Sequence, residues 1–584
     1  MKNLVSHLPL LAIAAQATIA TKDCRCFPGH DCWPTDETWS AFNASIGGNL
    51  IRTIPIGQVC HDPHYDEETC ENLKSRWLDP EVHIDSSHSV QSGLFANASC
   101  DPMAPREEPC IGTYVQYSVA VNNADDISKT VHFANAQNIR LVIRNTAHDY
   151  LGKSTGAGAI AIWTSKLKDV AKLTYDGTTY KGDAIKMGAG VLAAEVSEYA
   201  SKHGLVVMSG NCPTVGIGGG FIQGGGHGPL GSLLGMAADS ALAFEVVTGT
   251  GELVVADADK NADLFWALRG GGGSTYGVVV STTVKAYGDV SINFGSLMFT
   301  SDGLEEDRFY EAVAALYEVI PAIVDAGAVP IFLLTPQVFA LQELIAPNMT
   351  ETEVEKLLEP FIAKLEGIEY VKNVVPYKSW KLTNPNPFCL SDFDFQADAL
   401  IPMTKQQANI FMGGSWLMPR SSITDQARRA EYAKTIKEIV KSGLIVQQLG
   451  FNMSKKPGSD IDNAVLPAWR DTLLHTVVGT LYNSQATPDE NKNVLAVVHD
   501  GGIQKLANLA PESGAYMSEA YAFSPNWKKD FYGVNYDKLE GIKDKYDPTH
   551  LFYALTAVGS DYWVEQDDKR LCKRSSSSYA KDEL

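Results

Sequence analysis

Two glycine-rich stretches of this chain each present a side chain that can bond covalently to a ligand. Residues 144–152 contain His148, and residues 210–220 contain Cys212, 64 residues further along. Imidazole and thiol are both nucleophiles. Glycine has no Cβ, so the surrounding backbone can approach a large flat or anionic ligand closely and can point N–H groups at phosphate oxygens. We expect the two side chains to hold one ligand, with tight turns or flexible loops as the alternative interpretation.

The glycine pattern excludes two common nucleotide-binding devices. A second run at residues 224–228 follows the first, and apolar side chains such as Val215 and Phe221 interrupt the glycines, which favours a ligand-contacting backbone over a flexible loop. A dinucleotide fingerprint needs Gly-x-Gly-x-x-Gly after a strand and an acidic residue about 20 positions later, and this run does not fit it. The sequence also has no Gly-Lys-Ser/Thr phosphate loop.

Both stretches resemble those of the berberine bridge enzyme-like FAD-linked oxidases, a branch of the vanillyl-alcohol oxidase superfamily with a PCMH-type FAD-binding domain. The resemblance covers about residues 110–290 and 510–565. It is strongest to a fungal subgroup that contains isoamyl alcohol oxidase-like enzymes and secondary-metabolite oxidases. One departure is Ala147, where many relatives have glycine; alanine still permits close approach, so we expect the histidyl link to be kept.

The resemblance implies an FAD bonded at two points, through His148 to its 8α-methyl group and through Cys212 to C6. At Val215 the family has a modest apolar side chain that leaves oxygen a path to the flavin, so we expect O2 as the acceptor and hydrogen peroxide as the co-product. We expect no nicotinamide and no metal. The other cofactor-binding positions that the resemblance carries over are Arg144, Asn145, Thr146, Ala147, Gly152, Gly210, Val215, Gly216, Gly218, Gly219, Gly220, Gly225, Gly228, Gly277 and Val278.

A late segment, residues 515–520, supplies the candidate catalytic groups. It resembles the family's Tyr-x-Asn-(Tyr/Glu) segment, which implies that Glu519 acts as the base and that Tyr516 binds a substrate oxygen. Burial against an apolar flavin face is expected to raise the pKa of Glu519 toward useful base strength. The alternatives are a solvated glutamate and a buried core tyrosine. His227, in the second glycine run, could lie near the flavin, but a structural role is the favoured interpretation for a lone histidine.

Two functions follow from these residues. In the first, the chain is an oxidase that takes a hydride from an alcohol or amine carbon of a small apolar metabolite, in fungal secondary metabolism. In the second, the flavoprotein is a scaffold for a non-redox or oxidative cyclisation of a metabolite. Double attachment of the flavin and the presence of Glu519 favour the first. The substrate cannot be read from the sequence, and neither can the oligomeric state.

Composition and termini bear on partners and compartment. The net charge of −21 over 584 residues argues against nucleic acid or an anionic membrane as a partner. Residues 1–20 have the pattern of a cleaved signal peptide, and no later run of about 20 apolar residues exists. Residues 581–584 read Lys-Asp-Glu-Leu, the endoplasmic-reticulum retrieval signal. We expect a location in the endoplasmic-reticulum lumen, or secretion if the tetrapeptide was added to the natural chain.

Cysteine usage fits an oxidising compartment. Seven of the ten cysteines lie between residues 24 and 110. Cys60, His61, His64 and Cys70 invite a zinc interpretation, but no second Cys/His pair has zinc-finger spacing, so disulfides are favoured. With Cys212 on the flavin, nine cysteines remain, and at least one stays outside intrachain disulfides. Four sequons fit luminal glycosylation: Asn43, Asn97, Asn348 and Asn452.

These groups must be positioned by a two-domain α+β fold of the vanillyl-alcohol oxidase type. Strands alternate with helices from 119 to 287, and a β-branched run at 140–144 ends at the histidine loop. We predict helices at 127–137, 192–203, 305–324, 351–365, 425–442 and 489–509, and central strands at 329–334 and 445–451. The central sheet is expected to be mixed or antiparallel with helices on one face. The predicted segments are a signal peptide (1–20), a cysteine-rich leader (21–110), an FAD-binding domain (111–288) completed by 526–572, a substrate domain (289–525) and a tail (573–584).

Overall fold

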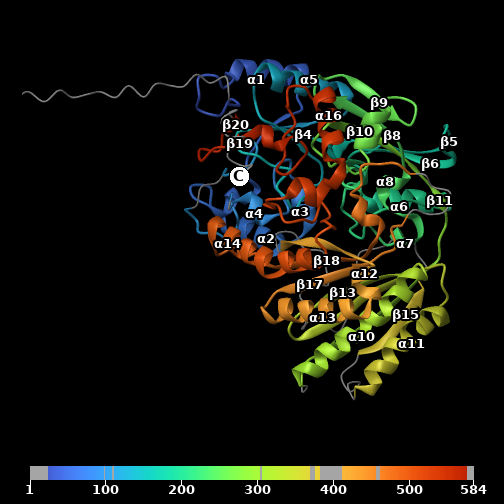
Figure 1. Ribbon diagram of the computed structural model, residues 1–584. Coiled ribbons are helices and arrows are strands. Elements are labelled where there is room, and N and C mark those ends of the chain that lie inside the picture. The colour runs from blue at the N-terminus through green and yellow to red at the C-terminus, as the bar shows by residue number, and fades with distance from the viewer. Residues whose placement is uncertain are drawn as a thin grey trace, which may run out of the picture.

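The computed structural model describes residues 24–97, 99–107, 111–302, 305–368, 375–381, 411–454 and 461–574. The expected signal peptide and the C-terminal tetrapeptide therefore lie outside the described residues. In Figure 1 the blue, green and red elements form one part of the molecule, and the yellow and orange strands and helices form a second part below it. The described N-terminal and C-terminal segments thus meet in the first part, and the middle of the chain builds the second.

A small sheet with a parallel core carries the histidine loop. Its strand order is β1-β2-β4-β3, in which β2, β4 and β3 run parallel and β1 pairs antiparallel with β2. Helix α5 follows β2 and begins at Asn123, whose side chain accepts a hydrogen bond from the Asp126 N–H. Strand β3 ends at Arg144, so the loop with His148 starts at the carboxyl end of a buried strand. The elements are β1 (Leu50–Arg52), β2 (Tyr117–Ala120), α5 (Ala124–Ala136), β3 (Leu141–Arg144) and β4 (Ile160–Trp163).

A five-stranded antiparallel sheet, in the order β5-β6-β10-β8-β9, holds the second glycine stretch. The glycines form a π-helical turn at Ile217–Phe221, and the Thr282 hydroxyl on β10 donates to the Gly218 carbonyl at 2.9 Å. The strands are β5 (Val170–Asp176), β6 (Lys181–Gly188), β8 (Ala241–Thr248), β9 (Leu253–Asp257) and β10 (Gly277–Lys285). Around them lie α6 (Ala193–Ser201), β7 (Leu205–Val206), α7 (Gly231–Leu234), α8 (Ala237–Ser240), α9 (Ala262–Ala267) and β11 (Tyr287–Gly288).

The middle of the chain forms a seven-stranded sheet in the order β15-β12-β14-β13-β17-β18-β16. Every described pairing in it is antiparallel. Helices α10, α11 and α13 lie along the strands in the lower part of Figure 1. The strands are β12 (Ile292–Thr300), β13 (Val329–Leu334), β14 (Val338–Pro347), β15 (Val375–Lys381), β16 (Phe411–Pro419), β17 (Ile445–Gly450) and β18 (Thr472–Leu481). The helices are α10 (Glu306–Asp325), α11 (Glu351–Gly367), α12 (Ser421–Thr424) and α13 (Gln426–Lys441).

A buried ion pair joins the two parts. Arg470, which follows β17 in the chain, places two nitrogens 2.7 and 2.8 Å from the carboxylate of Asp239 on α8. Asp239 is buried, and burial alone would raise its pKa, but the hydrogen bonds and charge of Arg470 bring that pKa below its usual value. Asn463 adds a hydrogen bond at 2.7 Å. The pair therefore stays ionised and fixes the segment that leads into β18.

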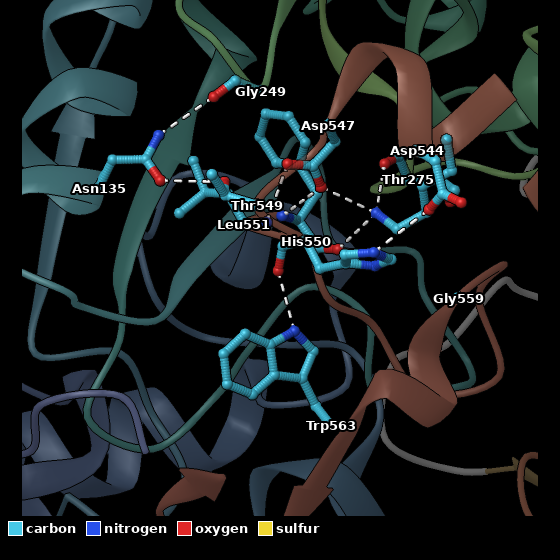
Figure 2. Close-up of polar contacts among 12 residues, drawn as sticks. Asn135, Gly249, Thr275, Asp544, Asp547, Thr549, His550, Leu551, Gly559 and Trp563 are labelled. Carbon is cyan, nitrogen blue, oxygen red and sulfur yellow. Dashed lines mark hydrogen bonds and ion pairs between the residues drawn. The ribbon is translucent and has the colours of Figure 1, made fainter. Parts of the chain in front are cut away.

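The C-terminal segment packs back on the first part. After α14 (Pro488–Val498) and α15 (Gln504–Leu509), the chain passes through α16 (Tyr536–Tyr546) and ends in the hairpin β19 (Trp563–Glu565) and β20 (Leu571–Lys573). Figure 2 shows Asp547, just after α16, accepting a hydrogen bond from Leu551, with Asn135 donating to Gly249 nearby. The ammonium of Lys543 lies 2.8 Å from Asp547 and donates to two backbone carbonyls, and both charged side chains are buried.

Replacing Lys543 by methionine is expected to destabilise the protein by about 3–5 kcal/mol, because it leaves the buried Asp547 carboxylate without its cation. Lys545 offers a matched control on the same helix. Its pair with Asp263 has 58% and 35% of the side chains exposed, and Lys545→Met should cost only about 0.2–1 kcal/mol. The urea midpoint of each purified variant checks this. Equal shifts for the two variants would contradict it.

Disulfide bonds cross-link the N-terminal leader. Cys24 pairs with Cys572, Cys26 with Cys32 and Cys60 with Cys70, and Cys100 is also disulfide-bonded. The preference for disulfides over zinc at Cys60 and Cys70 is therefore confirmed. His61 instead contacts the backbone carbonyls of Asp101 and Arg106. The leader's helices are α1 (Asp36–Ser45), α2 (Glu67–Arg76), α3 (Pro80–Ile84) and α4 (Gly93–Ala96).

The predicted α+β fold is confirmed, and five of the six predicted helices match single helices of the structure within a few residues. The helix predicted at 489–509 is interrupted by a π-helical turn at His499–Ile503. A Cβ on Gly502 would lie 2.6 Å from Val478, so glycine lets this turn pack directly on β18. Within the described ranges, no helix is both long and apolar enough to cross a bilayer. The domain boundaries stay predictions.

Candidate functional site

One cavity brings the histidine loop, the cysteine loop and the late segment together. It contains about 1270 Å³ of empty space, a volume that includes open solvent. His148, Cys212, Tyr516 and Glu519 all line it. Residues up to 371 positions apart in the sequence therefore face one space.

The two candidate attachment loops contact each other directly. Nε2 of His148 lies 2.7 Å from the hydroxyl of Thr214, two residues after Cys212. Burial lowers the pKa of His148 to about 3, and the nearby His83 lowers it further. The imidazole is consequently neutral at ordinary pH, which is its nucleophilic form. Cys212 is a half-buried thiol in the wall of the same cavity.

The departure at Ala147 has a conformational consequence. Its φ is +58°, in the left-handed region that favours glycine and costs about 1–2 kcal/mol for other residues. Two contacts hold this turn: the Gln91 backbone N–H donates to the Ala147 carbonyl at 3.3 Å, and the Gln91 side chain donates to the Thr146 carbonyl at 3.1 Å. Glycine would adopt this conformation without strain. That the histidyl link is kept with alanine at this position stays a prediction.

The cavity wall presents hydrogen-bond acceptors, and its glycines let the backbone come close to a ligand. A flat isoalloxazine ring requires both. Oδ1 of Asn145 and Oε1 of Gln223 are buried and have no hydrogen-bond partner among the described residues. Buried polar atoms are nearly always paired, so two unpaired acceptors on one cavity indicate a ligand with N–H donors. A Cβ on Gly216 would lie 2.3 Å from Nδ2 of Asn145, so glycine is needed for this approach.

The predicted cofactor-binding residues fall into two groups. Those that line the cavity are Asn145, Thr146, Ala147, His148, Cys212, Val215, Gly216, Gly219, Gly220 and Gly277. Those that do not line it are Arg144, Gly152, Gly210, Gly218, Gly225, Gly228 and Val278. Members of the second group serve packing: the Arg144 guanidinium donates to the carbonyls of His83 and Ser86, and a Cβ on Gly228 would lie 1.9 Å from the Ser209 carbonyl oxygen.

Glu519 lies between two histidines. Its Oε1 is 3.1 Å from Nε2 of His227, and its Oε2 is 2.7 Å from Nε2 of His475 on β18. His475 is fully buried, while 11% of the His227 side chain is exposed. Thus His227, for which a structural role was the favoured interpretation, contacts the candidate base directly.

The expected rise in the pKa of Glu519 is wrong. Burial does raise this pKa, but the imidazoles of His227 and His475, which face the two carboxylate oxygens at hydrogen-bond distance, outweigh burial and hold it well below its usual range. Burial lowers the pKa of His475, although Glu519 opposes that shift. The pKa of the buried Tyr516 phenol is raised, first by burial and then by the Glu519 charge, so Tyr516 remains a hydrogen-bond donor.

Sequence reasoning missed several groups at the site. Tyr150, Gln223 and Ser518 also line the cavity. Gln223 stands between the two glycine runs. This position could have identified it as a site residue, because a polar side chain there has to face the ligand or the protein interior. His475 is the one titratable residue of β18, but its partner is 44 residues away in the sequence, and no spacing pattern connects the two.

Comparison with known proteins agrees with this geometry. The family model described as "FAD binding domain" matches residues 115–257, and the model described as "Berberine and berberine like" matches residues 515–559. The first match contains both attachment loops, and the second contains Tyr516 and Glu519. Both models therefore fall on the walls of the cavity.

Full-length relatives are similar along nearly the whole chain. FAD-linked oxidoreductase ZEB1 of Gibberella zeae is 40% identical over 97% of this chain and 98% of its own length. Bifunctional decalin synthase calF of Penicillium decumbens is 37% identical over 98% of this chain and 99% of its own. The VAO-type flavoprotein oxidase VAO615 of Thermothelomyces thermophilus is 34% identical over 97% and 99%.

The fold comparison leads to the same class. The crystal structure of the VAO-type flavoprotein MtVAO615 from Myceliophthora thermophila C1 has a TM-score of 0.86, and the match covers 94% of this chain and 100% of that one. The chain belongs to the berberine bridge enzyme-like FAD-linked oxidoreductases with the vanillyl-alcohol oxidase-type fold. It is an FAD-dependent enzyme, and the resemblance seen in its residues is confirmed.

Proposed function

We propose that this enzyme oxidises an alcohol or amine carbon of a small apolar metabolite in fungal secondary metabolism, with an FAD bonded to both His148 and Cys212. The observation that carries the proposal is the single cavity lined by these two residues and by Glu519. The bound FAD supplies the redox step by accepting a hydride from the substrate carbon. The experiment is a panel of alcohols, amines and secondary metabolites mixed with the purified enzyme without oxygen. Bleaching of the flavin absorbance identifies substrates, and no bleaching with any compound would count against the proposal.

Double attachment is supported by the chemistry of the two loops. A neutral imidazole and the thiolate of a cysteine are the forms that can bond to an electrophilic ring. The contact between His148 and Thr214 keeps the loops together, so both side chains can face one ring system.

Glu519 is the proposed proton acceptor. Loss of a hydride from the carbon makes the substrate O–H or N–H strongly acidic, so even a carboxylate with a low pKa can take the proton when it is positioned at the bond. Glu519 lines the cavity with 27% of its side chain exposed. Tyr516 is proposed to donate a hydrogen bond to the substrate heteroatom, and its raised pKa keeps that proton in place.

Oxygen is the proposed electron acceptor, and Val215 is proposed to leave it a path. Val215→Ile should slow reoxidation of the reduced flavin by air about tenfold, an effect of about 1.4 kcal/mol on the barrier, because the added methylene narrows the cavity beside Cys212. Stopped-flow mixing of reduced enzyme with oxygenated buffer measures this, and Val215→Ala is the matched control that should not slow it. An Ile variant that reoxidises at the original rate would contradict the proposed path.

A second candidate function rests on one relative. Because calF is described as a bifunctional decalin synthase, cyclisation of a metabolite in this cavity is the alternative, either after oxidation or without it. Peroxide measured against product identifies a non-redox cyclisation, which gives none, because oxidation with or without ring closure gives one peroxide per product. The number of rings in the product, determined by NMR, then separates an oxidative cyclisation from oxidation alone.

We further propose the endoplasmic-reticulum lumen as the location. The disulfides of the leader support an oxidising compartment, and the two terminal signals support luminal retention. Secretion by cells that express the chain without residues 581–584, and retention of the intact chain, would be the expected pattern.

A further inference from the structure

A histidine from each part of the molecule holds Glu519. His227 lies in the second glycine run, six residues after the π-helical turn of the first part, and His475 lies on β18 of the seven-stranded sheet. Their Nε2 atoms are 3.1 and 2.7 Å from different oxygens of the same carboxylate. Both oxygens are thereby occupied, and the carboxylate is fixed at the junction of the two parts.

Packed aromatic rings restrict how these imidazoles can turn. The His227 ring lies 5.1 Å from Tyr516 and 5.3 Å from Phe451, between ring centroids. The His475 ring lies 5.4 Å from Trp469. A ring flip, which would put Cε1 in the place of Nε2, would have to displace these neighbours, so the contacts to Glu519 are built into the fold.

The other ring nitrogens show which form the imidazoles take. Nδ1 of His227 and Nδ1 of His475 are both buried and have no hydrogen-bond partner among the described residues. A neutral imidazole with its proton on Nε2 donates to Glu519 and leaves only a lone pair at Nδ1. A protonated imidazolium, or a neutral ring bound to a metal through Nε2, would leave a buried N–H without an acceptor, which costs more.

The unpaired Nδ1 atoms also bear on whether the cluster of His227, His475 and Glu519 binds a metal ion or serves as a hydrogen-bonded carboxylate. The ligand atoms of His227, His475 and Glu519 all lie within 4.8 Å of one another, close enough to share a metal ion. Histidines that bind metals almost always donate their second N–H to an acceptor, and neither of these has one. The cluster therefore suits a hydrogen-bonded carboxylate better than a metal.

We infer that His227 and His475, both neutral with the proton on Nε2, are positioning residues that keep Glu519 ionised and aimed into the cavity. The inference rests on the proposed function, in which Glu519 takes the substrate proton. Glu519 takes the O–H or N–H proton of the substrate, and a bound FAD would accept the hydride. Glu519 then gives the proton up to solvent or to the peroxide formed from oxygen, and the two N–H donors favour the ionised carboxylate that the next turnover needs. The donors work against burial, which favours the neutral acid.

If either histidine is replaced by a residue that cannot donate a hydrogen bond, burial should dominate the pKa of Glu519. The titratable groups that face Glu519 are His227, His475, Tyr516 and, across the cavity, Tyr150. Both tyrosines have raised pKa values and stay neutral. Lys153 lines the same cavity but makes no described hydrogen bond to Glu519, so no other described side chain replaces a lost histidine donor. The carboxylate pKa then rises, and flavin reduction falls as pH drops through that raised value. The intact enzyme keeps Glu519 ionised and has no such fall between about pH 5 and 8.

The first test needs no substrate, so it is readable even if the proposed function fails. The FAD-containing enzyme is labelled with ¹⁵N-histidine, and the two signals are assigned from their loss in His227→Gln and His475→Gln. The expected result is two neutral imidazoles protonated at Nε2 from pH 5 to 8, with well under one metal ion per chain by elemental analysis. Signals from Nδ1–H tautomers or imidazolium, or a metal ion lost on His475→Gln, would overturn the inference.

The second test uses the pH dependence of anaerobic flavin reduction with a substrate from the panel. His475→Leu removes the donor and should move the acid limb upward by about one pH unit or more. His475→Gln, which keeps an N–H near the position of Nε2, should restore most of the original profile. His550→Asn is the control: His550 is a histidine remote from the cavity, and its φ of +47° suits asparagine (Figure 2). A uniform rate loss with an unmoved acid limb in His475→Leu would mean that His475 is merely structural.

Discussion

Replacing Glu519 by glutamine is expected to slow anaerobic flavin reduction about 100-fold or more, the usual contribution of a positioned base. Glutamine keeps the size of the side chain and can still pair with one histidine, but it cannot accept the substrate proton. Flavin content and the thermal midpoint should stay near those of the unchanged enzyme, because Glu519 lines a cavity and carries no part of the core. Rapid mixing of enzyme and substrate without oxygen gives the rate.

Exposed Glu512, seven residues earlier in the chain, provides the matched control. Glu512→Gln should reduce its flavin at the original rate. If Glu519→Gln folds, holds its flavin and is reduced at the normal rate, the role of proton acceptor passes to Tyr516 or to a group on the central sheet.

Local chemistry made much of the site predictable from the sequence. His148 and Cys212 stand in short segments whose glycines restrict what the backbone can do, and a few neighbouring residues suffice to define such loops. The helices α10, α11 and α13 could likewise be predicted, because their apolar residues recur with helical spacing and each begins after a polar residue that the pattern marks as a helix start.

Contacts between distant segments were not predictable in the same way. The pKa of Glu519 depends on His227 and His475, which are 292 and 44 residues away, and no local pattern encodes either contact. Burial alone suggested a raised pKa, and two hydrogen-bond donors reversed its direction. The positive φ of Ala147 was also hidden, because alanine gives no sign of a left-handed backbone.

Packing against a neighbouring strand explains the one misjudged helix. Residues 489–509 have an uninterrupted helical pattern, yet Gly501 and Gly502 allow an extra residue in the turn where the helix meets β18. A π-helical turn of this kind depends on the strand below it, and that strand lies earlier in the chain.

Removing both covalent bonds to the flavin has the largest expected effect of all, because the denatured protein then loses its flavin completely instead of keeping it. The unchanged protein should stay yellow after denaturation and acid precipitation, since two bonds hold the ring. His148→Ala and Cys212→Ala should each keep flavin attached through the remaining bond. The double variant should release it completely on denaturation, because the rest of the cavity offers only contacts that unfolding removes.

The most direct measurement of this account is therefore the flavin content of the denatured protein across these four chains, determined by absorbance of pellet and supernatant and by the intact mass of the polypeptide. The account predicts one FAD per chain in the pellet for the unchanged protein and both single variants, and none for the double variant. Flavin that washes out of the unchanged denatured protein, or that stays with the double variant, would contradict attachment through His148 and Cys212.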